Sequence, residues 1–193
     1  MTNKRKGFTL VELLIVIVVI GILSAMMMLS STEAVSSAKA NNVISNLRNL
    51  KTAVTSWYVD NIDRVQPNGK DNGNTKYKIT KADGTGEQSL TQFVNTDEGN
   101  KELLRYLNNE KAINLKSDKS SQKTDGDYYI KDRDWKQWYV WYKIGSDTRV
   151  KEKLASRAKS LGLIGLADIT KDAITDTYTN EKYVGMFVLA LDE

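Results

Sequence analysis

The sequence predicts an α+β fold in which one long amino-terminal helix forms a spine and packs on a small, mainly antiparallel β-sheet. Two observations support this class. An almost unbroken apolar run continues directly into an amphipathic helical pattern, and the last third of the chain alternates apolar and polar residues with many aromatics. One globular domain attached to an apolar helix is therefore expected.

The apolar run extends from Phe8 to Leu29 and contains a single charged residue, Glu12. As a helix, these 22 residues measure about 33 Å, which is enough to cross a hydrocarbon core of about 30 Å. Three basic residues, Lys4, Arg5 and Lys6, precede the run. Because basic residues favour the cytoplasmic side, we expect a single-pass protein with its carboxy-terminal domain outside.

The same segment could be a secretory signal, and the residues after it weigh against this. A signal is cut at a small-x-small site that follows its apolar region. The triplet Leu23-Ser24-Ala25 does not fit, because leucine is not small and the apolar run continues beyond it. A cut after Ala34 is the alternative that the pattern leaves open.

The helix is expected to continue past the apolar run to about Asp60. Beyond Ala40 the apolar residues fall within about 100° of arc on a helical wheel, and polar residues occupy the other side. Pro67 with Asn68-Gly69 excludes a further extension. The apolar stripe consists of Val43, Leu47, Leu50, Val54, Trp57 and Tyr58. A domain is expected to pack on this stripe.

Residues 66–100 are rich in Asn, Asp, Gly, Thr and Lys, and they predict a loop-dominated connection with a strand-like piece at Tyr77–Thr80. Residues 71–74 and 125–127 offer oxygen ligands of the kind that calcium prefers, but neither segment has the spacing of a calcium loop. Turn chemistry explains both clusters, so no metal site is predicted. Leu103, Leu104 and Leu107 then predict a short helix ending near Asn109.

The carboxy-terminal third predicts a hairpin, a helix and a central strand. The hairpin pairs Tyr128–Ile130 with Trp135–Ile144, and the last strand is Tyr183–Leu191, apolar enough to lie centrally. The apolar spacing of Val150, Leu154, Ala158 and Leu161 predicts a helix up to Gly162.

The second hairpin strand places aromatic side chains on both of its faces. Trp138, Val140, Tyr142 and Ile144 share one face, and Trp135, Tyr139 and Trp141 lie on or near the other. These last three could pack in the domain, line a subunit contact, or bind glycans or surfaces. Packing is the favoured interpretation, because exposed aromatic clusters promote aggregation.

The octapeptide Lys6-Gly7-Phe8-Thr9-Leu10-Val11-Glu12-Leu13 resembles the processing site of the type IV pilin and pseudopilin family. The resemblance implies that a membrane peptidase cuts between Gly7 and Phe8 and methylates the new Phe8 amine. It also implies that Glu12 pairs with the Phe8 ammonium of a neighbouring subunit during assembly. The alternative is an interfacial glutamate that reaches the lipid headgroups.

With this resemblance the chain divides into a leader (1–7), a transmembrane or filament-core helix (8–33) and an extracytoplasmic domain (34–193). The implied function is that of a type IV pilus subunit serving adhesion, motility or DNA uptake. The implied partners are other pilins, the prepilin peptidase, the assembly platform with its ATPase, and the cytoplasmic membrane. After assembly the protein is expected in a cell-surface pilus.

Two alternatives to a pilus subunit remain open. One is a pseudopilin of a type II secretion or competence apparatus. The other is a membrane-anchored binding module or minor tip adhesin that uses the Trp and Tyr strand. For the pilus subunit and for both alternatives, no enzymatic activity and no cofactor are expected.

Composition limits the chemistry further. Loss of the three basic leader residues reduces the formal net charge from +4 to +1, which gives no argument for nucleic-acid binding. The chain has no histidine, so it cannot form Ser-His-Asp or Cys-His catalytic sets or histidine metal sites. It also has no cysteine. Many members of the family close the carboxy-terminal region with a disulfide, and here another interaction must hold it.

In family members the amino-terminal helix often unwinds during assembly near a glycine and a following proline. This chain has Gly21 but no proline before Pro67.

Overall fold

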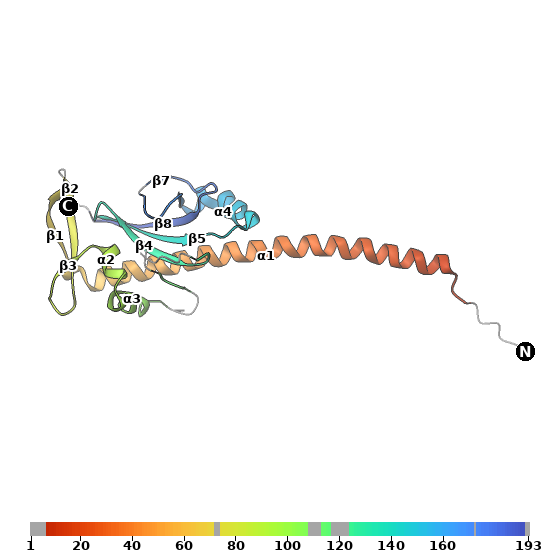
Figure 1. Ribbon diagram of the computed structural model, residues 1–193, viewed down its shortest axis with the longest axis horizontal. Helices are drawn as coiled ribbons and strands as arrows, with labels where there is room; N and C mark the ends of the chain where they lie inside the picture. Colours follow the sequence, from red (N-terminus) through yellow and green to blue (C-terminus); the bar gives the residue numbers. More distant parts are fainter. Residues whose placement is uncertain (1–6, 72–73, 108–112, 117–123, 172, 192–193) are drawn as a thin grey trace, which may run out of the picture.

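The computed structural model describes residues 7–71, 74–107, 113–116, 124–171 and 173–191. A helix of 51 residues, α1 (Leu10–Asp60), runs the length of the molecule, and its amino-terminal half projects away from the globular part (Figure 1). The rest of the described chain forms two antiparallel sheets and three shorter helices around the other half of α1. The predicted α+β class with a helical spine is confirmed.

Local hydrogen bonds explain where α1 begins and where it ends. Thr9 caps the first turn through its side chain, and Glu12 completes a capping box. At the other end the Asn61 backbone N–H donates to the Trp57 carbonyl at 3.0 Å, and the Asn61 side-chain amide donates to the same carbonyl at 2.9 Å. A single 3₁₀ turn, η1 (Ile62–Arg64), follows. The helix thus ends at the predicted Asp60, and it is continuous through Gly21.

The larger sheet has the order β4-β5-β8-β6-β7, and every neighbouring pair is antiparallel. The predicted hairpin is present as β4 and β5, and the last strand, β8, lies centrally as predicted. The helix α4 (Thr148–Leu161) ends at Gly162, whose φ of +63° suits glycine. The strands are β4 (Tyr128–Arg133), β5 (Gln137–Lys143), β6 (Leu163–Leu166), β7 (Ile174–Thr175) and β8 (Tyr183–Ala190).

The prediction of a loop-dominated connection over residues 66–100 was wrong. Two seven-residue strands form a hairpin there, a third short strand pairs with it, and two helices follow. Pro67 is accommodated because β1 lies at an edge of this sheet, where a missing N–H breaks no ladder. The elements are β1 (Val65–Asp71), β2 (Asn74–Thr80), β3 (Glu87–Gln88), α2 (Leu90–Val94) and α3 (Asp97–Leu104).

The short helix expected up to Asn109 is α3, and it ends earlier, at Leu104. Leu107 is buried beyond its end, and Asn109 lies outside the described residues. Of the two segments with calcium-type oxygen ligands, 71–74 includes residues outside the described part of the chain. In the other cluster Asp127 is buried, and its carboxylate accepts hydrogen bonds from the Asn114 side chain at 2.6 Å and the Thr124 backbone at 3.0 Å.

The main core lies between α1 and the inner face of the larger sheet. Trp57 of α1 packs on Phe93 of α2 and Trp138 of β5, with ring centroids 5.0 and 6.2 Å apart. Val150 and Leu154 of α4 close the core on the side of the projecting half of α1. The core joins the smaller sheet through Val65 and Ile79. The apolar stripe of α1 therefore packs as the sequence indicated.

The carboxy-terminal strand is held without a disulfide. β8 pairs with β5 on one side and with β6 on the other, and the Leu191 N–H donates to the Lys136 carbonyl at 2.9 Å just beyond the strand. Its central place in the sheet explains how a chain without cysteine can fix this end.

Candidate functional site

The amino-terminal end of α1 places the predicted processing and assembly residues on an open segment. Gly7, Phe8 and Thr9 precede the first helical residue, and the Phe8 side chain is 86% exposed. The peptide bond between Gly7 and Phe8 is therefore outside the helix and away from the globular part (Figure 1). The basic residues expected before it, Lys4, Arg5 and Lys6, lie outside the described residues.

Glu12 is oriented by the capping box at this helix end. One carboxylate oxygen, Oε2, accepts from the Thr9 backbone N–H at 2.8 Å and from the Thr9 hydroxyl at 2.9 Å. In return the Thr9 hydroxyl oxygen accepts from the Glu12 N–H at 3.2 Å. Among the described residues, Oε1 of Glu12 has no hydrogen-bond partner. The carboxylate is thus held at the positive end of the helix dipole with free acceptor capacity.

The amino-terminal half of α1 carries a large apolar surface that the domain does not cover. Its side chains from Leu10 to Met28 are all exposed, and buried residues of the helix begin at Ser36. Within the described chain, α1 is the one helix long and apolar enough to cross a membrane. The exposed apolar half and the packed half are one continuous helix.

The three aromatic residues singled out in the sequence do not share one environment. Tyr139 and Trp141 are 8% and 1% exposed, and they belong to a second apolar cluster on the outer face of the larger sheet. Burial there raises the pKa of the Tyr139 hydroxyl. The other members of this cluster are Tyr129, Leu166, Ile169 and Tyr183.

Trp135 was predicted to start the second hairpin strand, and this placement was wrong. It lies in the turn before β5, where Asp134 and Trp135 have φ angles of +51° and +63°. The turn consists of Asp134, Trp135 and Lys136, and two successive positive φ angles usually require glycine or asparagine, which are absent here. The ring is half-buried, and the Lys76 ammonium lies 5.4 Å from its centroid.

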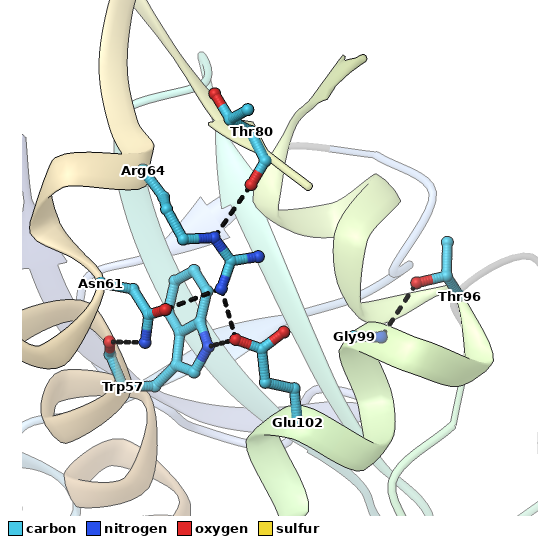
Figure 2. Close-up of polar contacts among 7 residues, drawn as sticks. All are labelled: Trp57, Asn61, Arg64, Thr80, Thr96, Gly99 and Glu102. Atoms are coloured by element: carbon cyan, nitrogen blue, oxygen red, sulfur yellow. Dashed lines mark hydrogen bonds and ion pairs between the residues drawn. The ribbon is translucent and has the colours of Figure 1, made fainter. Parts of the chain in front are cut away.

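A buried polar cluster near the end of α1 was not predicted (Figure 2). The Arg64 guanidinium lies 5.7 Å from the Trp57 ring centroid, donates through Nε to the Thr80 carbonyl at 3.0 Å, and forms an ion pair with Glu102. Glu102 also accepts from the Trp57 indole N–H at 2.9 Å. Because Arg64, Thr80 and Glu102 come from η1, β2 and α3, no local sequence pattern predicts their contacts. The cluster ties α3 to the distal end of α1.

Comparison with known proteins agrees with this arrangement. Residues 2–28 match the model of the family described as "Prokaryotic N-terminal methylation motif". The chain is 30% identical over 132 residues to a fimbrial protein of Pseudomonas aeruginosa, and the match covers 64% of this chain and 83% of that protein.

Two further relatives are less fully covered. Fimbrial protein Q of Moraxella bovis is 34% identical over 99 residues, which are 50% of this chain and 62% of that protein. The chain thus spans slightly less than two thirds of the length of this relative. The type IV major pilin protein PilE of Neisseria gonorrhoeae is 29% identical over 107 residues, which are 53% of this chain and 64% of PilE. No solved structure matches the chain.

An apolar helix that projects from a small antiparallel domain defines a pilin-like class of subunit. The similarity to the Pseudomonas fimbrial protein extends beyond the helix into that domain. The chain belongs to the type IV pilin family.

Proposed function

We propose that this protein is a structural subunit of a type IV pilus, made as a prepilin that is cut between Gly7 and Phe8 and methylated at the Phe8 amine. The proposal includes a membrane-inserted stage, with the amino terminus in the cytoplasm, and polymerisation with other pilins through α1. A prepilin peptidase and an assembly platform with its ATPase would act on it. Residues 8–33 would be the embedded segment and 34–193 the extracytoplasmic domain.

The observation that carries this proposal is the two-part character of α1. Its amino-terminal half exposes apolar side chains on all sides, whereas the following half is fixed in the domain core. Such a surface is unfavourable in water and needs lipid or other apolar helices around it. Because the two halves form one helix, pulling the domain away from a bilayer would carry the apolar half with it. Lateral packing against the same helix of other subunits would then replace the lipid.

Glu12 is the residue proposed to set the position of one subunit relative to the next. After cleavage its carboxylate would be five residues into the chain, with Oε2 held by Thr9 and Oε1 available. An ammonium of a neighbouring Phe8 at about 4 Å, in an effective dielectric of about 20, would gain roughly 4 kcal/mol before desolvation. That is comparable to the cost of about 2.5–3.5 kcal/mol for a charge at the bilayer centre.

The test is Glu12→Ala, compared with Glu33→Ala on the same helix. Insertion depends on the apolar run and cleavage on Gly7, so we expect both variants to insert and to be cut. We expect Glu12→Ala alone to lose surface filaments, measured as pilin in the sheared fraction against pilin in the membrane. Normal filament yield from Glu12→Ala would refute the proposed role of the carboxylate.

A further inference from the structure

The helix α4 lies beside α1 (Figure 1), and its residues line a groove with Ser30 and Glu33, which follow the apolar run directly. Its buried face, which includes Val150, Leu154 and Ala158, packs into the main core. Its amino-terminal turns are tied to α1 by two ion pairs. Lys153 Nζ lies 2.7 Å from a Glu33 carboxylate oxygen, and Lys39 Nζ lies 3.4 Å from an Asp147 carboxylate oxygen. The position of α4 relative to α1 is thus well defined.

One surface of α4 faces the projecting half of α1. An open groove of about 660 Å³ lies between the two helices, and it reaches Ser30, the first residue after the apolar run. Its lining residues are Ser30 and Glu33 of α1 with Arg149, Glu152, Lys153 and Ser156 of α4. At 100° per residue, these α4 residues form one helical face, to which Ser160 and Lys159 also belong. We call residues 149, 152, 153, 156, 159 and 160 the proximal face.

Positive charge is concentrated in α4. The helix has five basic residues and one acidic residue, a formal charge of +4, which equals that of the entire chain. Within the domain, residues 34–193, the part outside α4 carries a formal charge of −1. The proximal face itself has a formal charge of +2, because it includes Glu152 beside Arg149, Lys153 and Lys159. Lys153 is paired with Glu33, whereas Arg149 and Lys159 are exposed and, among the described residues, form no ion pair. The domain is therefore electrostatically asymmetric, with its positive end beside the apolar helix.

The axial position of this charge can be derived from the helix rise. Glu33, which holds Lys153, is four residues beyond Leu29, or about 6 Å along α1. The headgroup layer of each leaflet is about 5–7 Å thick beyond the hydrocarbon core. If the run from Phe8 to Leu29 fills that core, Arg149 and Lys153 lie at the level of the lipid phosphates.

We propose that the proximal face of α4 docks on anionic phospholipid headgroups while the subunit is inserted in the membrane. This rests on the proposed function, because it requires the inserted stage. Since α1 is continuous and α4 lies on one side of it, docking would tilt α1 toward α4 and orient the domain before extraction. The rest of the domain, with a formal charge of −1, would add no attraction to the same surface.

An anionic bilayer fits this surface better than duplex DNA does, since the basic residues stand directly beside the membrane-length helix. When α1 is inserted, the bilayer surface would lie directly opposite the proximal face of α4. Axial withdrawal of α1 by one turn, about 5.4 Å, would take the face out of the headgroup layer. The contact would therefore act on the membrane-inserted subunit and end with its extraction.

The experiment uses the full chain in lipid vesicles of phosphatidylcholine, either alone or with about 30% phosphatidylglycerol. Because the chain has no cysteine, Ser156→Cys on the proximal face accepts a single fluorophore. Quenching by a headgroup nitroxide lipid then reports docked domains. We expect more quenching in the phosphatidylglycerol vesicles, and a decrease when salt rises from about 0.05 to about 0.5 M.

The charge-reversed variant Arg149→Glu with Lys159→Glu tests the face directly. We expect the ratio of docked to undocked domains to fall at least about fivefold, the factor that one basic residue contributes near an anionic surface. The matched control is Lys70→Glu with Lys101→Glu, which has the same net charge and alters exposed residues far from the apolar run. The control should stay within about twofold of the parent chain.

Four results would overturn the proposal. Equal quenching in both kinds of vesicle, or equal loss in the reversed and control variants, would show that α4 does not recognise lipid charge. Binding of a short DNA duplex that depends on Arg149 and Lys159, without any effect of lipid charge, would assign the face to nucleic acid instead. Failure of the chain to resist alkaline extraction from vesicles, measured first, would overturn the inserted stage of the proposed function as well.

Discussion

Removal of the Glu102 carboxylate should weaken the domain measurably, because two buried donors depend on it. The Arg64 and Glu102 side chains are only 17% and 18% exposed, and the same glutamate oxygen accepts from the Trp57 indole at 2.9 Å. The Arg64 guanidinium also lies 5.8 Å from the Phe93 ring centroid. Its charge would remain in this apolar surrounding after the carboxylate is lost.

The magnitude follows from these contacts. Both hydrogen bonds to Glu102 have an ionised acceptor, and a hydrogen bond to a charged group contributes about 1.5–3 kcal/mol when fully shielded from water. Since water reaches part of both side chains, we expect Glu102→Ala to lower the unfolding free energy by about 2–3 kcal/mol. Glu102→Gln keeps an acceptor oxygen and removes the charge, so it should cost about 1 kcal/mol.

The assay is urea unfolding of the fragment 34–193, which retains all buried residues of the described chain. Tryptophan fluorescence reports directly on the site, because Trp57 is part of it. Glu98→Ala, an exposed position on the same helix, is the control and should change stability by less than about 0.5 kcal/mol. A Glu102→Ala fragment as stable as that control would show that the carboxylate does not stabilise the Arg64 and Trp57 donors.

Two further predictions follow from the buried aromatic residues. Trp141→Ala should lower the unfolding free energy of the same fragment by about 3–5 kcal/mol, because Trp141 is buried. Trp135→Ala should lower it clearly less, because Trp135 lies half-buried in a turn. Equal decreases of the unfolding free energy in urea would contradict the distinction between the two sites. Burial raises the pKa of the Tyr128 and Tyr178 hydroxyls above the value of about 10 expected in the unfolded chain. The neutral phenols thus contribute stability that is complete below about pH 10 and is lost as the pH rises toward the folded-state pKa. The unfolding free energy should fall above pH 10, with tyrosinate absorbance of these residues appearing on unfolding; full ionisation near pH 10 in the folded domain would contradict this.

The elements that the sequence predicts well are those with a long or strongly apolar pattern. The spine could be predicted from Phe8 to about Asp60, close to the observed Leu10–Asp60, because a helical stripe repeats over many turns and the apolar run has no break. The β4–β5 hairpin and β8 were also predictable, since β-branched and aromatic residues dominate these strands. Their side chains face apolar surfaces on both sides of the sheet.

The elements that were missed have polar strands or distant partners. β1 carries mostly Gln, Asn, Lys and Asp, together with Pro67 and Gly69, so it has no alternating pattern to detect. β2 does alternate, and its Tyr77–Thr80 part was predicted, but the pairing of the two strands was not. Trp135 occupies a turn position where the sequence suggests a strand. Arg64 and Glu102 are 38 residues apart, and nothing local relates them. By contrast, the octapeptide around Gly7, Phe8 and Glu12 is contiguous, so it could be recognised, and its chemistry stays a prediction.

The most direct test of the central claim is the intact mass of the subunit in filaments sheared from the cell surface. A pilus subunit cut between Gly7 and Phe8 should have the mass of residues 8–193 with one added methyl group, and fragmentation should locate that group on the Phe8 amine. Filaments made of this subunit would establish that the apolar half of α1 is retained and polymerised. A chain that begins at Met1, or after Ala34 without the apolar helix, would contradict the account.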